Sequence, residues 1–289
     1  MTPMLLPDDV SIREMTAEDI AAGLTLCRAS HWNQTEQDWR FFLTAAPHGA
    51  LVAQDGGGRV IGTVATLPYG PFTWISMVLV EPAARGRHVG TTLLQRGLDL
   101  VGTDAAARLD ATPSGEAIYR KLGFAAEYRL ARWCLDVTPA LAGRRARARP
   151  IEPVDWPAIR AMDERAFGAS RVGVLRRLAD DAPEYARVIA RGGDVQGYLF
   201  GRHGHNREHL GPLVADGPDT AAALLESTLA ERPDRRIYVD APDEQREWRD
   251  VLSRLGFVVE RPFLRMHRGP LTTPGTPSAI YAIAGPEFG

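Results

Sequence analysis

The spacing of apolar residues along the first half of the chain predicts alternating helices and strands. Two opening segments place apolar residues at helical spacing, and shorter alternating or continuous apolar runs follow, as is typical of strands. A DGGG turn separates the first two strands. The predicted helices cover 19–30, 35–46, a long segment from 91, and a segment around 116–122; the predicted strands cover 50–54, 60–67, 74–80 and 107–112. This order is typical of an α/β arrangement with parallel strand pairing.

The second half of the chain repeats the end of this pattern. RIYVDAP, EWRDVLSRLGF and VVERPFLRM follow one another as ARLDATP, EAIYRKLGF and AAEYRLARW do, so Asp240 stands where Asp110 does. Such repetition predicts an internal duplication. Upstream, LGPLVADGPDTAAALLEST replaces MVLVEPAARGRHVGTTLLQ, but it lacks the RGxxxG loop. We expect the copy to keep the fold without that loop.

A segment rich in Pro, Arg, Ala and Gly at 138–153 separates the two patterned regions. The length of 289 residues suits two domains of ordinary size. The sequence therefore predicts a first domain over 1–138, a linker over 139–152 and a second domain over 153–289.

Composition narrows the class of protein. Apolar residues at 45% and charged residues at 24% are ordinary for a soluble protein, and no apolar run has the length of a membrane span. The N-terminus lacks the pattern of a signal peptide, so we expect a cytoplasmic protein without a membrane partner. A net charge of −2 argues against a nucleic-acid partner. Cys27 and Cys134, the only cysteines, have no metal-site spacing, so we predict two buried thiols and no metal.

The segment RGRHVG, between a predicted strand and a predicted helix, is a candidate phosphate site. Backbone N–H groups at a helix N-terminus, with the partial positive charge there, suit a pyrophosphate, and glycines allow its close approach. By itself such a loop also fits an ordinary turn between a strand and a helix.

The predicted strand, the RGRHVG loop and the predicted helix together resemble the signature of the GNAT superfamily of acetyltransferases. That family follows an apolar strand with Arg/Gln-x-x-Gly-x-Gly/Ala and a helix; here Arg85 and Gly90 take the first and last positions, while His88 replaces the middle glycine. We expect a left-handed backbone conformation at His88, which histidine tolerates better than most residues. A second family feature, Tyr-x-x-x-Gly-Phe, is matched by Tyr119, Gly123 and Phe124. Nearly the whole chain resembles a bacterial subfamily of tandem-domain GNAT proteins.

The resemblance implies a fold and a co-substrate. The fold is two tandem GNAT-like domains of class α/β, each with a mixed, mainly antiparallel sheet, a splayed parallel strand pair and helices on both faces. The co-substrate is acetyl-CoA, and no metal is required. Backbone groups would pair with the pantetheine arm at Val78, Leu79 and Val80, and the pyrophosphate and its flanking contacts would fall on Arg85, Gly86, Arg87, His88, Val89, Gly90 and Thr91.

The resemblance also implies catalytic roles. Tyr119 takes the family position that protonates the departing thiolate, and the N–H of Val80 is the expected oxyanion donor. A packing role for Tyr119 stays open. Asp110, at the carboxyl end of its strand, is a candidate base or ammonium partner, but its counterpart Asp240 in a copy without the loop equally suits a structural role. Glu81 is a second candidate base.

The acceptor pocket is expected between the two opening helices. Trp32, Asn33 and Gln34 offer an aromatic wall and amide groups for a small polar amine, although the next residue, Thr35, also suits an N-cap. Near the end of the chain, Tyr281, Glu287 and Gly289 are further candidates for that pocket. The expected activity is acetyl transfer to a small amine; the alternatives are a CoA-binding sensor without turnover and acetylation of a protein or peptide amine.

Overall fold

The computed structural model describes residues 6–7, 9–102, 105–138 and 148–289. Contacts divide the chain into two compact units, the first made of Met1–Leu109 and His267–Pro270, the second of Asp110–Met266 and Leu271–Gly289. Of the predicted linker, residues 139–147 lie outside the described part of the chain, and Arg149–Pro150 form strand β7. The end of the predicted linker therefore belongs to a sheet.

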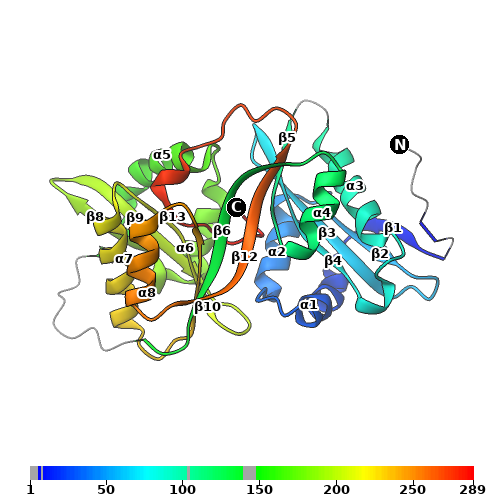
Figure 1. Ribbon diagram of the computed structural model, residues 1–289, viewed down its shortest axis with the longest axis horizontal. Coiled ribbons are helices and arrows are strands. Elements are labelled where there is room, and N and C mark those ends of the chain that lie inside the picture. The colour runs from blue at the N-terminus through cyan, green and yellow to red at the C-terminus, as the bar shows by residue number, and fades with distance from the viewer. Residues whose placement is uncertain (1–5, 8, 103–104, 139–147) are drawn as a thin grey trace. The chain divides into compact units, whose positions relative to one another are not determined.

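The first unit is a sheet in the order β1-β2-β3-β4-β5, followed in Figure 1 through the blue and cyan ribbons. Its strands pair antiparallel except for β4 and β5, which are parallel, as the sequence predicts. Helix α3 packs on β2, β3 and β4, and α1 and α2 pack on one another and on β3. The bounds are β1 Ser11–Glu14, α1 Ile20–Ala29, α2 Glu36–Ala45, β2 Ala50–Gln54, β3 Val60–Pro68, β4 Phe72–Val80, α3 Val89–Val101 and β5 Ala106–Ala111.

Helix α2 begins where its sequence predicts. The Asp38 carboxylate accepts hydrogen bonds from the N–H and the hydroxyl of Thr35, at 2.7 and 3.1 Å, which satisfies donors at the helix start. The apolar face carries Trp39 and Phe42 into the core, where both are buried. The indole of Trp39 lies against Gly23 of α1, at which an added Cβ would come within 2.9 Å of the ring. This close approach fixes the packing of α1 on α2.

The second unit contains the sheet β12-β6-β11-β10-β9-β8-β7, with β13 paired to β10. Helix α7 packs on β8, β9 and β10, and α5 and α6 pack on β9. Cys27 and Cys134 are buried thiols outside any disulfide bond, as the sequence predicts. The bounds are α4 Pro113–Lys121, β6 Ala125–Leu135, β7 Arg149–Pro150, α5 Trp156–Phe167, α6 Val172–Asp181, β8 Arg187–Arg191, β9 Asp194–Arg202, β10 Glu208–Ala215, α7 Pro218–Glu231, β11 Ile237–Pro242, α8 Arg246–Arg254, β12 Val258–Arg268 and β13 Ile280–Ala282.

The order of elements confirms the duplication and extends it to the whole of both halves. From β1 to β6 and from β7 to β12 the helices and strands follow the same sequence. Each copy opens with the same ion pair: Arg13 holds Asp19 and Arg149 holds Asp155, each through two hydrogen bonds of 2.7 Å. The equal spacing of these Arg and Asp residues is a further sign of the duplication in the sequence.

Strand β6 has a partner that the sequence did not indicate. It follows β5 and α4 in the chain, yet it pairs antiparallel with β11 of the second copy, from Leu135↔Ile237 to Leu130↔Pro242. In Figure 1 the green β6 and orange β12 run side by side. The last strand of the first copy is thus built into the sheet of the second unit.

Candidate active site

Strand β4 carries a bulge in the apolar run WISMVLV. Its pairing with β3 shifts register between Ala65↔Ser76 and Thr63↔Leu79, and within the bulge Met77 has a φ of 54°. A left-handed backbone at a non-glycine residue is strained and persists where the surroundings hold it. The Thr63 hydroxyl donates a 2.7 Å hydrogen bond to the Met77 carbonyl and helps to hold it.

The bulge leaves the end of β4 with backbone groups directed away from β3. Parallel pairing with β5 ends, among the described residues, at Trp74↔Arg108. The N–H of Glu81 donates to the Ile61 carbonyl at 2.8 Å, and N–H directions alternate along a strand, so the N–H of Val80 points away from β3. The splayed parallel strand pair that the family resemblance implies is therefore confirmed for β4 and β5.

The loop between β4 and α3 forms an exposed helix N-terminus. Gly86 has a φ of 78°, and His88 has φ 62° and ψ 2°, the left-handed conformation expected from the sequence. The first bond of α3 runs from the Thr92 N–H to the His88 carbonyl at 2.9 Å. The preceding amides of an α-helix have no intrahelical acceptor, so this loop presents a row of donors where an anion is favoured.

The arginines of this loop have defined partners. Arg85 donates from Nε to the Val80 carbonyl at 3.2 Å, which ties the loop to the end of β4. Arg87 forms a 2.8 Å ion pair with Asp9, and both side chains are exposed. Such a surface pair contributes little to stability, so a phosphate can replace Asp9 as the partner of Arg87 at small cost.

The second unit lacks the loop of this site, and the space where its strands part is occupied by another segment of the chain. Only Asp216 and Gly217 separate β10 from α7, so no loop precedes that helix. Strands β10 and β11 also pair only at their start, but here β13 lies beside β10, and the Ile283 N–H donates to the Asp240 carbonyl on β11 at 2.9 Å. The C-terminal segment thus fills the splay of the second copy.

Tyr119 lies on α4 with its ring packed in a defined orientation. The ring contacts Phe124 edge to face at 5.8 Å between centroids, and it lies over Gly115, where an added Cβ would come within 2.7 Å of it. Burial raises the pKa of Tyr119 to about 12. The phenol therefore keeps its proton at neutral pH, which a proton donor requires.

The carboxylate of Asp110 is engaged in a buried ion pair. Arg265 on β12 donates to both of its oxygens at 2.9 Å and to the Tyr128 hydroxyl at 2.6 Å. The side chains of Asp110 and Arg265 are at most 1% exposed. Since a carboxylate held by a guanidinium attracts a proton poorly, this placement favours the structural role of Asp110 over the role of base.

The equivalent ion pair in the second copy supports a structural role for Asp110. Asp240 on β11 accepts from Arg132 on β6 at 2.8 and 2.6 Å, again with both side chains buried. Asp240 thus repeats the environment of Asp110 in the copy without a phosphate loop. Each aspartate is held by an arginine from a strand of the other copy, a pairing that the sequence did not reveal.

We expect Asp110→Asn to destabilise the fold by about 3–5 kcal/mol, because it leaves the Arg265 guanidinium buried without its counter-charge. Asp240→Asn is expected to have an effect of similar size, and the exposed Asp250→Asn almost none. Thermal and urea unfolding measure the three variants. Unchanged stability with lost turnover per folded molecule would instead make Asp110 the base.

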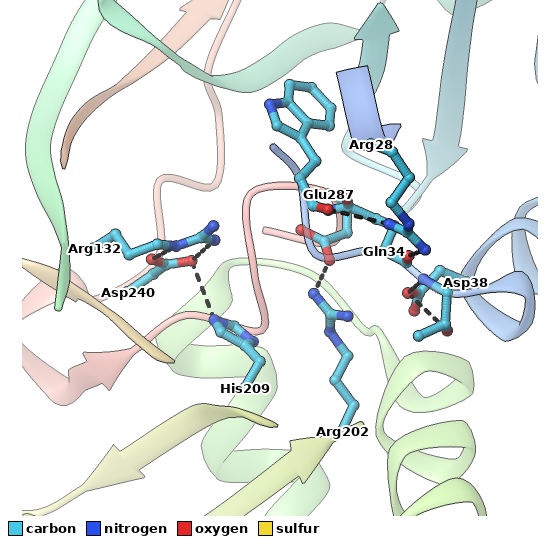
Figure 2. Close-up of polar contacts among 10 residues, drawn as sticks. Arg28, Gln34, Asp38, Arg132, Arg202, His209, Asp240 and Glu287 are labelled. Carbon is cyan, nitrogen blue, oxygen red and sulfur yellow. Dashed lines mark hydrogen bonds and ion pairs between the residues drawn. The ribbon is translucent and has the colours of Figure 1, made fainter. Parts of the chain in front are cut away.

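The loop predicted to line the acceptor pocket, residues 32–34, is held in place through its backbone carbonyls. Arg28 of α1 donates to the carbonyls of Trp32 and Gln34, at 3.1 and 2.8 Å, a contact visible in Figure 2. Asn33 and Gln34 are buried, at 2% and 5% exposure, and Gln34 Oε1 has no hydrogen-bond partner within the described part of the chain. A buried, unmet acceptor on a fixed loop suits recognition of a donor group.

Glu81, the alternative base, forms a 2.6 Å ion pair with Arg59. Tyr281 lies on β13, and its ring packs edge to face on that of Trp248. Glu287 pairs with Arg202, and the Gly289 carbonyl accepts a hydrogen bond from Arg171, so these contacts also lie within the second unit.

Among the residues that the structure describes, no group of three His, Cys, Asp or Glu is placed to hold a metal ion. None of the described helices has the length and apolar character needed to cross a membrane.

Comparison with known proteins assigns both halves to one family. Residues 15–124 match the model of the acetyltransferase (GNAT) family, and residues 159–282 match that of an acetyltransferase (GNAT) domain. The chain is 25% identical to the uncharacterized N-acetyltransferase YitH of Bacillus subtilis (83% of this chain, 85% of the relative). It is also 25% identical to the holothin acyltransferase of a Pseudoalteromonas species (75% of this chain, 74% of the relative).

Solved structures share the fold. A putative acetyltransferase from Pyrococcus horikoshii matches with a TM-score of 0.84 at 22% identity, over 100% of this chain and 99% of the other. A tandem GNAT protein from the clavulanic acid biosynthesis pathway matches with a TM-score of 0.62 at 18% identity, over 90% and 99%. The chain is an acyltransferase of the GNAT superfamily. Within that superfamily it is a tandem-GNAT protein, with one GNAT domain in each half.

Proposed function

We propose that this protein transfers the acetyl group of acetyl-CoA directly to an amine of a small polar molecule, and that its first copy alone binds the acyl-CoA. The observation that carries this proposal is the contrast between the copies. Only the first combines an exposed glycine-containing loop at a helix N-terminus with a bulged β4 whose end is splayed. The second has neither loop nor free splay.

The geometry supports a role for each part of this site. The amides from Gly86 to Thr91 receive the pyrophosphate, with the charge of Arg85 and Arg87 beside them. The backbone of Val78 to Val80 pairs with the amides of the pantetheine arm as an added strand would. The N–H of Val80 stabilises the negative charge that develops on the thioester oxygen.

Tyr119 completes the reaction by giving its proton to the thiolate of CoA. As the amine attacks the thioester carbon, the C–N bond forms and the C–S bond breaks. The amine loses one proton to solvent or a base, and Tyr119 regains its own from solvent. Trp32, Asn33 and Gln34 are the proposed contacts of the acceptor.

Thiol release from acetyl-CoA, measured with a library of small amines, tests this function. We expect amine-dependent release with some members, and a mass increase of those amines by one acetyl group. Binding of acetyl-CoA without release for any amine or peptide would favour the sensor. Because one relative is named an acyltransferase, longer acyl-CoAs belong in the same assay.

We expect one acetyl-CoA to bind per chain. Calorimetric titration of the full chain measures the stoichiometry, and the physical reason is that β13 already fills the splay of the second copy. Two equivalent sites per chain would contradict the proposed division of labour between the copies.

A further inference from the structure

Helix α1 ends in a strained turn that leads directly into the loop of the proposed acceptor contacts. The N–H of His31 donates to the Arg28 carbonyl at 3.0 Å, and the N–H of Trp32 donates to the Cys27 carbonyl at 2.9 Å. These two bonds form a Schellman cap, which requires a left-handed backbone at His31. Its φ is 56°. Arg28 also holds the carbonyls of Trp32 and Gln34, so the turn and the loop form one fixed segment (Figure 2).

A glycine would make this turn without strain. The left-handed conformation costs free energy for any residue with a Cβ, although histidine tolerates it better than most. The corresponding helix of the second copy, α5, ends with such a glycine: Gly168 has a φ of 91°, and its N–H donates to the Glu164 carbonyl at 2.9 Å. His31 therefore stands where the turn favours glycine, and the turn alone does not explain its side chain.

Strained residues of this kind gather in the first unit. Among the described residues, only His31, Met77 and His88 combine a left-handed backbone with a side chain. Met77 lies in the bulge of β4 and His88 in the loop before α3, the two elements that carry the proposed acyl-CoA site. Backbone strain clusters at functional sites, where the surrounding structure holds it. His31 extends this set to the acceptor loop.

The imidazole of His31 has no partner within the protein. His31 is exposed, and no hydrogen bond or ion pair engages its side chain in the part of the chain that the structure describes. One ring nitrogen of a neutral imidazole is an acceptor. Because His31 directly precedes Trp32, a basic group borders the proposed acceptor contacts.

The proposed reaction needs a proton acceptor, since an amine must be neutral to attack a thioester. Both carboxylates that the sequence offered as a base are engaged. Arg265 holds Asp110 at 2.9 Å, and Arg59 holds one oxygen of Glu81 at 2.6 Å. An ion-paired carboxylate is a poorer base than a group without a counter-charge. Histidine is also the side chain whose charge ordinarily changes near neutral pH.

We propose that His31 is the base of the acetyl transfer, an inference that rests on the proposed function. One ring nitrogen accepts the proton that the amine nitrogen loses while the C–N bond forms and the C–S bond breaks. Tyr119 gives its proton to the thiolate of CoA. The imidazolium of His31 then returns its proton to solvent, to which this exposed residue has access, and Tyr119 regains one from solvent.

His31→Gly tests this role in the full chain, because glycine suits the turn and the variant should fold. We expect a melting temperature at or above that of the wild type, an unchanged affinity for acetyl-CoA, and amine-dependent thiol release lower by a factor of roughly 10². His205→Gly, at an exposed histidine of the second unit, is the matched control and should keep wild-type turnover.

Two results of this comparison have different meanings. Wild-type turnover in folded His31→Gly would overturn the role of His31 and leave acetyl transfer intact. No thiol release by the wild-type protein with any amine would refute the proposed function, and this inference with it.

Chemical rescue separates a base from a binding contact. Added 4-methylimidazole should restore part of the turnover of His31→Gly, while 4-bromoimidazole, similar in size but far less basic, should not. His31→Asn keeps a side chain that suits the turn and forms hydrogen bonds but takes up no proton, so it should be as slow as His31→Gly. No rescue, equal rescue by both imidazoles, or near wild-type turnover of His31→Asn would overturn the assignment of His31 as the base.

Discussion

Replacing Tyr119 by phenylalanine is expected to lower turnover by a factor on the order of 10² to 10⁴, while the affinity for acetyl-CoA stays near that of the wild type. The substitution removes only the hydroxyl, so the ring can still pack over Gly115 and against Phe124. Steady-state kinetics with an active amine, together with calorimetry for acetyl-CoA, measures the two quantities separately.

The pH profile gives an independent check on this role. The pKa of Tyr119 is raised above the ordinary value of about 10, to about 12, so the phenol stays protonated throughout the neutral and mildly alkaline range. Deprotonation of Tyr119 should therefore cause no loss of activity until the pH comes within about one unit of that pKa. Tyr69→Phe removes a hydroxyl elsewhere and serves as the control. A drop of only a few fold in Tyr119→Phe would identify a packing residue.

Replacing Gly90 by aspartate is expected to abolish acetyl-CoA binding. An added Cβ at this position lies 3.0 Å from Cγ2 of Val80, so the new side chain crowds the end of β4. Its carboxylate also places negative charge where the pyrophosphate is expected, and this repulsion adds to the clash. Calorimetry with acetyl-CoA measures the loss.

Gly217→Asp is the matched control, because Gly217 is the N-cap of α7, the helix of the second copy that corresponds to α3. An added Cβ at Gly217 has no described atom within 4 Å. This variant should bind acetyl-CoA as the wild type does. If Gly90→Asp binds normally while folded, the loop has no part in acyl-CoA recognition.

Local sequence predicted most helices and strands because their signals lie within a few residues. The DGGG turn, the Thr35 and Asp38 cap, and the apolar run of β4 each act through neighbours along the chain. The left-handed conformation at His88 was predictable for the same reason, since it follows from a position in a short loop. The duplication was visible from recurring motifs.

The role of Asp110 could not be predicted from such local signals. Its place at the end of a strand fits a base as well as a structural residue, and only the contact with Arg265, distant in sequence, separates the two. The same holds for Glu81, whose ion pair with Arg59 no motif indicates. Burial and ion pairing between remote segments decide such roles, and neither is encoded in spacing along the chain.

Periodicity, caps and loop motifs are short-range features, so the sequence alone predicted the two-copy organisation, the elements of the first copy, those at the end of the second, and the family. The tertiary structure decided that β6 joins the sheet of the second unit, that β13 fills the splay between β10 and β11, and that Asp110 and Asp240 are each held by an arginine. The physical reason is that strand pairing and buried charge pairs depend on which distant backbone and side-chain groups meet once the chain has folded.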